Sequence, residues 1–518
     1  MNSESVPSSD RRLGVAYYVL IAFSLSIGWG IRGNFGHEYG AMIAGALSAM
    51  AMVLMAGRAD WDRRIAYFAL FGALAWSFGG SMSYMKVIAY THSGHSPSVL
   101  YGYVSLFVIG FLWAAPGGAF TALPAFADRD RLTELFAPMS AVFVTWWVQE
   151  VWIVPWLVSK GYELNWFDTD WLGVLLAIVA IALLAAARRK LDRGSILILY
   201  MTIGWWVAFL TLVAGLGLRM TPPRGDNWAG CLGLTAGLLA YCLRNGLKPV
   251  AKAALVTGFI GGTGFAAASM LQLVEVTSGL STNWHSILEQ TTGLFNGIAI
   301  AVALAPAVRS APRVDDSPAV RRWTEVYSVG FVLLIITYLN LKKNVADWIK
   351  AGALPPLMFE VPSSVWFGLI YASLALAVLV PLIRHLKSPL PALAMSWAAR
   401  GTWLYLIFLW WMVLGNFEKQ LSGFRPQRLV TEGVITLNAA VCAMLLLVSL
   451  RARVQPQAEL PPARSGALRS TILIGVIFSA LAIGIDWGLT RLTYGDRPSG
   501  HAGLNIRFGP DATIGKPK

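Results

Sequence analysis

Long apolar stretches recur from one end of this 518-residue chain to the other, and they constrain its fold more than any other feature. A helix needs roughly 20 residues to cross a hydrocarbon layer about 30 Å thick, and most of these stretches come close to that length. Charged residues make up only 13% of the chain, against about 25% in soluble proteins. The sequence therefore predicts an all-α bundle that crosses a membrane many times.

Fifteen stretches qualify as membrane-spanning helices. They cover residues 13–30, 41–57, 65–85, 100–127, 136–158, 171–187, 195–217, 228–243, 252–275, 287–308, 326–341, 363–383, 402–415, 433–450 and 470–490. The fourth contains Pro116 and Pro124, which predict a kink. The first has no small-residue cleavage site after it, so we expect it to be retained as a helix.

The distribution of Lys and Arg predicts the orientation. With the N-terminus in the cytoplasm, most of the 41 basic residues fall in cytoplasmic segments, such as residues 188–193, and cytoplasmic loops are commonly basic. The C-terminal tail then lies outside, and we expect the cytoplasmic (inner) membrane. This bias accounts for the net charge of +14 without a nucleic-acid partner.

An offset of about 188 residues partly aligns the chain with itself. Glu38 aligns with Asp226 (226 − 38 = 188), and Arg32 falls near Arg219 (219 − 32 = 187). An even number of helices per copy would make the repeats parallel. The predicted units are a six-helix repeat at 1–194, a second at 195–401, a three-helix half repeat at 402–490 and an extracytoplasmic tail at 491–518.

The stretch SIGWGIRGNFGHEYGAMIAG, residues 26–45, places four polar groups between two apolar runs with almost no loop. Ionisable groups at membrane depth are costly and tend to be functional. A similar turn, GLRMTPPRGDNWAGC, follows the seventh predicted span. If the copies pack side by side, such turns converge on a polar pocket open to the outer side.

Four carboxyl groups are our candidates for catalysis: Glu38, Asp226, Glu150 and Glu289. Hydrolysis of a glycosidic bond uses two carboxyl groups, one as acid and one as base or nucleophile. Several of these residues begin apolar runs, however, and a carboxylate near a helix N-terminus also stabilises the helix by about 0.3–1 kcal/mol. Glu150 lies inside a span, where a hydrogen bond to a neighbouring helix is the structural alternative.

Arginine, tryptophan and other polar residues in the same turns are candidates for substrate binding. The predicted set is Arg32, Asn34, His37, Arg219, Arg224, Trp228, Trp284, His285, Arg428 and Glu432. The guanidinium group binds oxyanions through paired hydrogen bonds, and aromatic rings can stack on sugars. Arginines that simply pair with the carboxylates, and tryptophans of the membrane interface, are the alternatives.

No metal or cofactor is predicted. His92 and His95 have a spacing that could share a metal, but GHEYG at residues 36–40 lacks the second histidine of the H-E-x-x-H motif. A hydrated loop is the simpler interpretation of that pair. The three cysteines lie inside apolar runs and should pack as small apolar residues between helices.

Two functions of different class remain open. The first is a membrane enzyme with an outward-facing pocket that acts on a glycan or lipid-linked sugar, as a glycoside-hydrolase-type hydrolase or as a glycosyl or acyl transferase. The second is a secondary transporter for a sugar or organic anion, since parallel repeats and intramembrane charges occur in transporters. The enzyme is favoured because the inner halves of the spans are nearly free of ionisable groups. Membrane lipids and a small-molecule or glycan substrate are the expected partners.

Overall fold

The computed structural model describes residues 13–79, 82, 84–162, 170–220, 227–313, 322–387, 395–420, 426–452 and 467–496. Over these residues the secondary structure is helical, apart from a two-residue hairpin of β1 (Leu357–Met358) and β2 (Val361–Pro362). Thirteen of the described helices are long and apolar enough to cross a membrane. The predicted all-α, multi-pass class is confirmed.

Each predicted span falls on a helix. The elements of the first part are α1 (Val15–Phe35), α2 (His37–Ala56), α3 (Ala59–Asp62), α4 (Ile65–Gly79), α5 (Met85–Thr91), α6 (Ser96–Phe126), α7 (Arg129–Val148), η1 (Gln149–Ile153), α8 (Val154–Ser159) and α9 (Asp170–Arg188). Next come α10 (Arg193–Ala208), η3 (Phe209–Gly215), α11 (Asn227–Arg244), α12 (Lys248–Ala268), α13 (Met270–Ser278) and α14 (Trp284–Ser310). The last are α15 (Arg322–Gly330), η4 (Phe331–Ile336), α16 (Thr337–Lys350), α17 (Ser363–Lys387), α18 (Trp397–Lys419), α19 (Pro426–Ala452) and α20 (Leu468–Tyr494).

Two of the fifteen predicted spans do not correspond to any of the thirteen helices that are long and apolar enough to cross a membrane. The span at 65–85 was too long, because α4 ends at Gly79 and a separate short helix, α5, begins at Met85. The span at 228–243 falls on α11, which has 18 residues. The proline-containing fourth span is a single 31-residue helix, α6.

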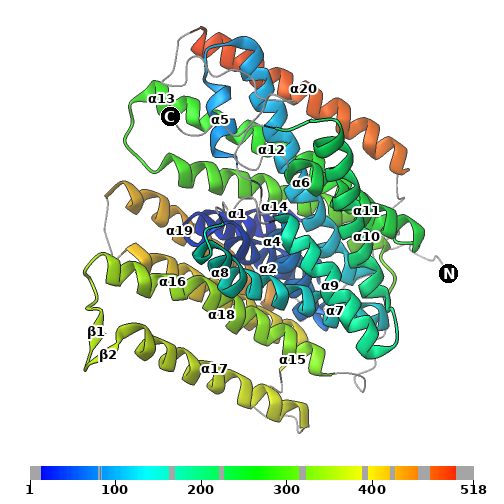
Figure 1. Cartoon of the computed structure of the whole chain (residues 1–518), viewed down its shortest axis with the longest axis vertical. Helices are drawn as coiled ribbons and strands as arrows, with labels where there is room; N and C mark the ends of the chain where they lie inside the picture. Colours follow the sequence, from blue (N-terminus) through cyan, green and yellow to red (C-terminus); the bar gives the residue numbers. More distant parts are fainter. Residues whose placement is uncertain are drawn as a thin grey trace, which may run out of the picture.

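Helices α1, α2 and α4 form the centre of the bundle, whereas α17 and α20 lie at opposite edges (Figure 1). Small residues let the central helices approach closely. A Cβ atom at Gly28 would lie 2.4 Å from the Ala44 Cα, and one at Gly45 would lie 2.4 Å from the Gly72 carbonyl oxygen. In a bilayer, where lipid is as apolar as leucine, such close packing is a main source of helix association.

Within the described ranges, three spans contain π-helical turns, η1, η3 and η4, which the sequence did not predict. A π-turn inserts an extra residue into an α-helix and changes which side chains face a neighbour, and such turns are frequent at functional sites. The first of them, η1, supplies two residues of the cavity described below.

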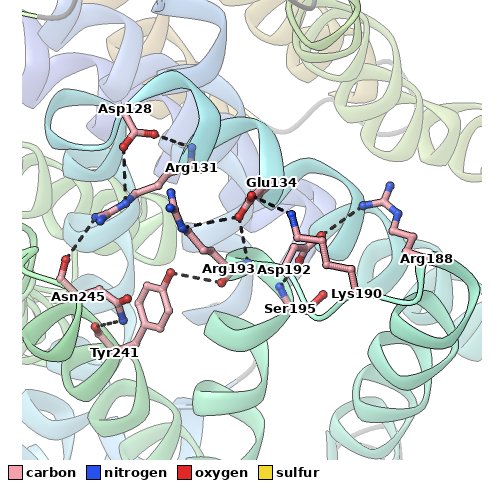
Figure 2. A network of polar contacts seen from close by, with 10 residues as sticks. All are labelled: Asp128, Arg131, Glu134, Arg188, Lys190, Asp192, Arg193, Ser195, Tyr241 and Asn245. Atoms are coloured by element: carbon pink, nitrogen blue, oxygen red, sulfur yellow. Dashed lines mark hydrogen bonds and ion pairs between the residues drawn. The ribbon is translucent and has the colours of Figure 1, made fainter.

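A polar network joins helix ends that the sequence places on the cytoplasmic side (Figure 2). Glu134 accepts a 3.1 Å hydrogen bond from the Arg193 backbone N–H and lies 3.4 Å from the Lys190 ammonium group. The Arg131 guanidinium donates a 3.2 Å hydrogen bond to the Asn245 carbonyl oxygen. The α6–α7 corner, the α9–α10 loop and the end of α11 are thereby tied together.

Candidate functional site

A cavity of about 330 Å³ lies between α6, α7, α9, α10, α11 and the first turn of α2. We call it the Glu38 cavity. Its lining residues are Glu38, Phe120, Met139, Val142, Trp146, Gln149, Glu150, Val154, Asp170, Gly173, Val174, Ala177, Leu197, Ile198, Met201, Thr202, Trp205, Asn227, Cys231 and Leu234.

Two predicted catalytic residues, Glu38 and Glu150, line this one cavity from different helices. Glu38 is half-buried at the start of α2, and Glu150 is exposed within η1. The hydroxyl group of Tyr39 donates a hydrogen bond to the Glu150 carboxylate. The backbone carbonyl of Tyr39 in turn accepts a 3.2 Å hydrogen bond from the Asn340 amide group. Glu38 directly precedes Tyr39 in the chain, so the residue that holds Glu150 is adjacent to the other carboxyl residue of the cavity.

The π-helical turn and a glycine shape the wall beside Glu150. Gln149 and Glu150 are consecutive, yet both line the cavity. On the facing helix, a Cβ atom at Gly173 would lie 2.6 Å from Trp146 Nε1 and 3.1 Å from Gln149 Oε1. Glycine at this position lets α9 come close enough to close the cavity wall.

The polar and apolar parts of the lining are separated along the helices. Five polar side chains lie in the first turns of α2, α9 and α11 and in η1: Glu38, Asp170, Asn227, Gln149 and Glu150. The apolar ones lie mainly deeper, on α6, α7, α9, α10 and α11: Phe120, Met139, Val142, Val174, Ala177, Leu197, Ile198, Met201 and Leu234. Thr202 also lines this deeper part, where its hydroxyl donates a 2.9 Å hydrogen bond to the Ile198 carbonyl oxygen. The cavity therefore has a polar end, which we call the mouth, and a mainly apolar remainder, which we call the body.

Two other nominated residues form a separate buried ion pair. An Arg32 guanidinium nitrogen lies 2.9 Å from a Glu289 carboxylate oxygen, with side-chain exposures of 1% and 2%. Tyr84 donates a hydrogen bond to the same carboxylate, and the His285 ring lies 3.7 Å from it. The Arg32 guanidinium also lies 4.6 Å from the ring centroid of Trp29. This geometry matches the structural alternative, in which the arginine pairs with a carboxylate.

Asn34 belongs to a third polar group that anchors the α1–α2 turn. Its amide donates a 2.6 Å hydrogen bond to Asn416, which donates to the buried carboxylate of Glu432. Lys419 and Lys343 donate to the backbone carbonyls of Asn34 and Phe35. The turn itself needs Gly36, whose φ of +102° is unfavourable for other residues.

The remaining nominees do not line the Glu38 cavity among the described residues. The Trp228 and Trp284 indoles donate to the carbonyls of Leu218 (3.0 Å) and Leu280 (2.9 Å). Arg428 donates a 3.0 Å hydrogen bond to Gln420, and Arg219 lies in the segment after η3. Arg224, Asp226 and the His37 side chain lie outside the described residues.

Sequence reasoning did not nominate Tyr39, Asp170 or Lys343. Tyr39 could have been found, because it follows Glu38 directly in the polar stretch. Asp170 begins an apolar run, as Glu38 does. Lys343 had no such signal, since its contact with Phe35 depends on how α16 packs against the α1–α2 turn.

The described cysteines and histidines form neither disulfides nor a metal cluster. Cys231, Cys242 and Cys442 are free and buried, as predicted. The His95 ring lies 2.8 Å from the Ser98 hydroxyl. Within the described ranges, no group of three His, Cys, Asp or Glu side chains is placed to hold a metal ion.

Comparison with protein-family models, with curated proteins and with solved structures finds no match to this chain. Its function must therefore be argued from the site itself.

Proposed function

We propose that the chain is an integral membrane enzyme that acts on a lipid-linked sugar at the Glu38 cavity, by hydrolysis or transfer at the glycosidic bond. One observation carries this proposal: two carboxyl residues from different helices line the polar end of a cavity whose body is mainly apolar. A lipid-linked sugar has the same division, with a polar part where the bond breaks and a hydrocarbon part beyond it.

Glu38 and Glu150 would share the acid–base work. One carboxylic acid gives its proton to the leaving glycosidic oxygen as the bond to the sugar breaks. The other carboxylate either takes the proton of an attacking water or acceptor hydroxyl, or attacks the sugar carbon itself. In the second case water or the acceptor hydroxyl then displaces the carboxylate from the sugar, and gives its proton to the first residue, now a base. Tyr39 would hold Glu150 in position through its hydrogen bond.

The test is turnover by purified protein in detergent, with glycolipids and polyprenyl-linked sugars as substrates and no gradient. Glu38→Gln and Glu150→Gln should each lower kcat about 10²–10⁴-fold, because proton transfer by a positioned carboxyl group contributes that much. Glu418→Gln, at an exposed position outside the cavity lining, is the matched control and should keep normal turnover. Normal turnover in both cavity variants would refute the proposal.

A secondary transporter is the second candidate, favoured by the Arg32–Glu289 pair inside the bundle. Intramembrane charges often mark ion or substrate pathways. Protein reconstituted in sealed vesicles would then accumulate a labelled sugar or organic anion under an ion gradient. Accumulation without chemical conversion would favour this candidate over the enzyme.

We also infer the predicted duplication and orientation, with the N-terminus in the cytoplasm. The fifth and eleventh predicted spans, which the duplication makes equivalent, each contain a π-helical turn, Gln149–Ile153 and Phe331–Ile336, whereas η3 in the seventh span has no counterpart in α1. The starts of α2 and α11, which the repeat makes equivalent, both supply residues to the Glu38 cavity, Glu38 and Asn227. An experimental structure in which residues 1–194 and 195–401 fail to superpose helix by helix would exclude the duplication.

A further inference from the structure

We infer that the hydrophobic body of the Glu38 cavity is a binding site for one hydrocarbon chain, lying along the helices with its polar end at the carboxylates. The identity of the polar end as a sugar rests on the proposed function. The tail site rests on the shape, lining and membrane level of the cavity.

The cavity is long enough in the direction of the membrane normal to take a chain rather than a compact ligand. On α7 and η1 its lining runs from Met139 to Glu150, 11 positions apart (150 − 139 = 11). At about 1.5 Å per residue this is a length of roughly 16 Å, or about half of a 30 Å hydrocarbon layer. The lining on α10 extends down to Leu197, near the opposite end of that helix.

Exposed tryptophans place the mouth at the membrane surface. Trp152 and Trp156 are 56% and 57% exposed on either side of Val154, which lines the cavity just after η1, and Trp171 is 40% exposed beside Asp170. Tryptophan gathers at the level of the lipid head groups. The mouth is therefore at head-group level, and the hydrophobic body is at the level of the acyl chains.

Ala177 on α9 and Met201 on α10 line the hydrophobic body. Ala177 is only 4% exposed, so its side chain points into the bundle. A chain that moves from the bilayer into this cavity gains little from the hydrophobic effect, since lipid is equally apolar. Binding must then depend on fit, and a bulky side chain at position 177 should block it.

Cys231 lines the cavity, is not in a disulfide and donates a 3.7 Å hydrogen bond to Asn227, so its thiol can report on occupancy of the cavity. Cys242, on the same helix but 2% exposed and outside the lining, is an internal reference. Protein in nanodiscs would be treated with N-ethylmaleimide. Peptide mass spectrometry would then measure the rate at which each cysteine is alkylated. The three added compounds are methyl glucoside, hexadecanol and hexadecyl glucoside.

We expect hexadecanol and hexadecyl glucoside to slow Cys231 alkylation at least fivefold, and methyl glucoside to leave it unchanged. Ala177→Phe should abolish this protection. The matched control is Ala182→Phe, an exposed position on the same helix, which should keep it. Equal protection by methyl glucoside, no protection by the two long-chain compounds, or equal behaviour of the two variants would overturn the tail site.

A second measurement covers the case in which Ala177→Phe does not fold or Cys231 reacts too slowly. Hexadecyl glucoside with a diazirine at mid-chain would be photo-crosslinked to the wild-type protein. Adducts on lining residues such as Met139, Ala177 or Met201 would support the inference, whereas adducts confined to the lipid-facing helices α17 and α20 would refute it. Protection or crosslinking without turnover would refute the proposed enzyme and leave the tail site supported. Turnover that is insensitive to chain length and to Ala177→Phe would refute the tail site and leave the enzyme supported.

Discussion

At the scale of single residues, the polar side chains of the α1–α2 turn have two different surroundings. Arg32 and Asn34 pair with partners on distant helices, Glu289 and Asn416, and fix the turn in the bundle. Glu38, a few residues further, lines a cavity. A run of polar residues between apolar segments can therefore hold both structural and candidate catalytic groups, and their positions in the folded chain distinguish them.

Removing one partner of the buried pair should destabilise the protein strongly. Glu289→Ala leaves the Arg32 charge buried at 1% exposure, and breaking a buried ion pair in this way costs about 3–5 kcal/mol. Chemical unfolding in detergent, followed by tryptophan fluorescence, would measure the loss. The double variant Arg32→Leu/Glu289→Leu should recover much of it, because no uncompensated charge remains. A single variant as stable as the wild type would show that the pair contributes little.

At the scale of elements, glycines let α10 and α11 pack closely against each other. A Cβ atom at Gly233 would lie 1.9 Å from the Gly204 carbonyl oxygen, and one at Gly237 would lie 2.0 Å from the Tyr200 carbonyl oxygen. Both contacts are to backbone, which cannot move aside as a side chain can. These two helices also carry one wall of the Glu38 cavity, so their spacing sets its width.

Gly233→Ala should therefore push α10 and α11 apart and lower stability by about 1–3 kcal/mol, as overpacking typically does. Gly488→Ala on α20 meets nothing within 4 Å and should change stability by less than about 0.5 kcal/mol. Thermal unfolding of both variants beside the wild type would measure the difference. An equal change in stability for the two variants would show that α10 and α11 can move apart without destabilising the protein.

The sequence predicted elements better than it predicted partners. Every predicted span falls on a helix, because length and hydropathy suffice to find a membrane helix. The meeting of Glu38 and Glu150 in one cavity, and of Arg32 with Glu289, depends on which helices pack together. A helix surrounded by other helices and lipid is apolar on all sides, so its sequence lacks the polar face that indicates orientation in soluble proteins.

At the scale of the whole molecule, the helix ends sort into two faces with different chemistry. One face holds the basic network around Glu134 and Arg193 (Figure 2). The mouth of the Glu38 cavity lies at the opposite ends of α7, α9, α10 and α11. If the basic face is cytoplasmic, as the positive-inside rule predicts, the mouth opens toward the outside.

This orientation can be checked with single cysteines in a cysteine-free background. Lys190→Cys lies in the exposed α9–α10 loop, and Ala353→Cys lies in the exposed segment between α16 and α17. In intact cells a membrane-impermeant maleimide should label Ala353→Cys at once, and Lys190→Cys only after lysis. The opposite result would invert the topology and place the cavity mouth in the cytoplasm.

The Arg32–Glu289 contact joins residues 257 positions apart, and this separation bears on biosynthesis. A ribosome adds about 5–20 residues per second, so Glu289 is synthesised roughly 13–50 s after Arg32. Until Glu289 is made, the Arg32 guanidinium of the nascent α1–α2 hairpin must lie near the lipid head groups or beside another protein. The early helices are thus expected to settle at their final depth only after α14 has left the translocon, and a pulse–chase protease-protection assay on truncated nascent chains would reveal that late step.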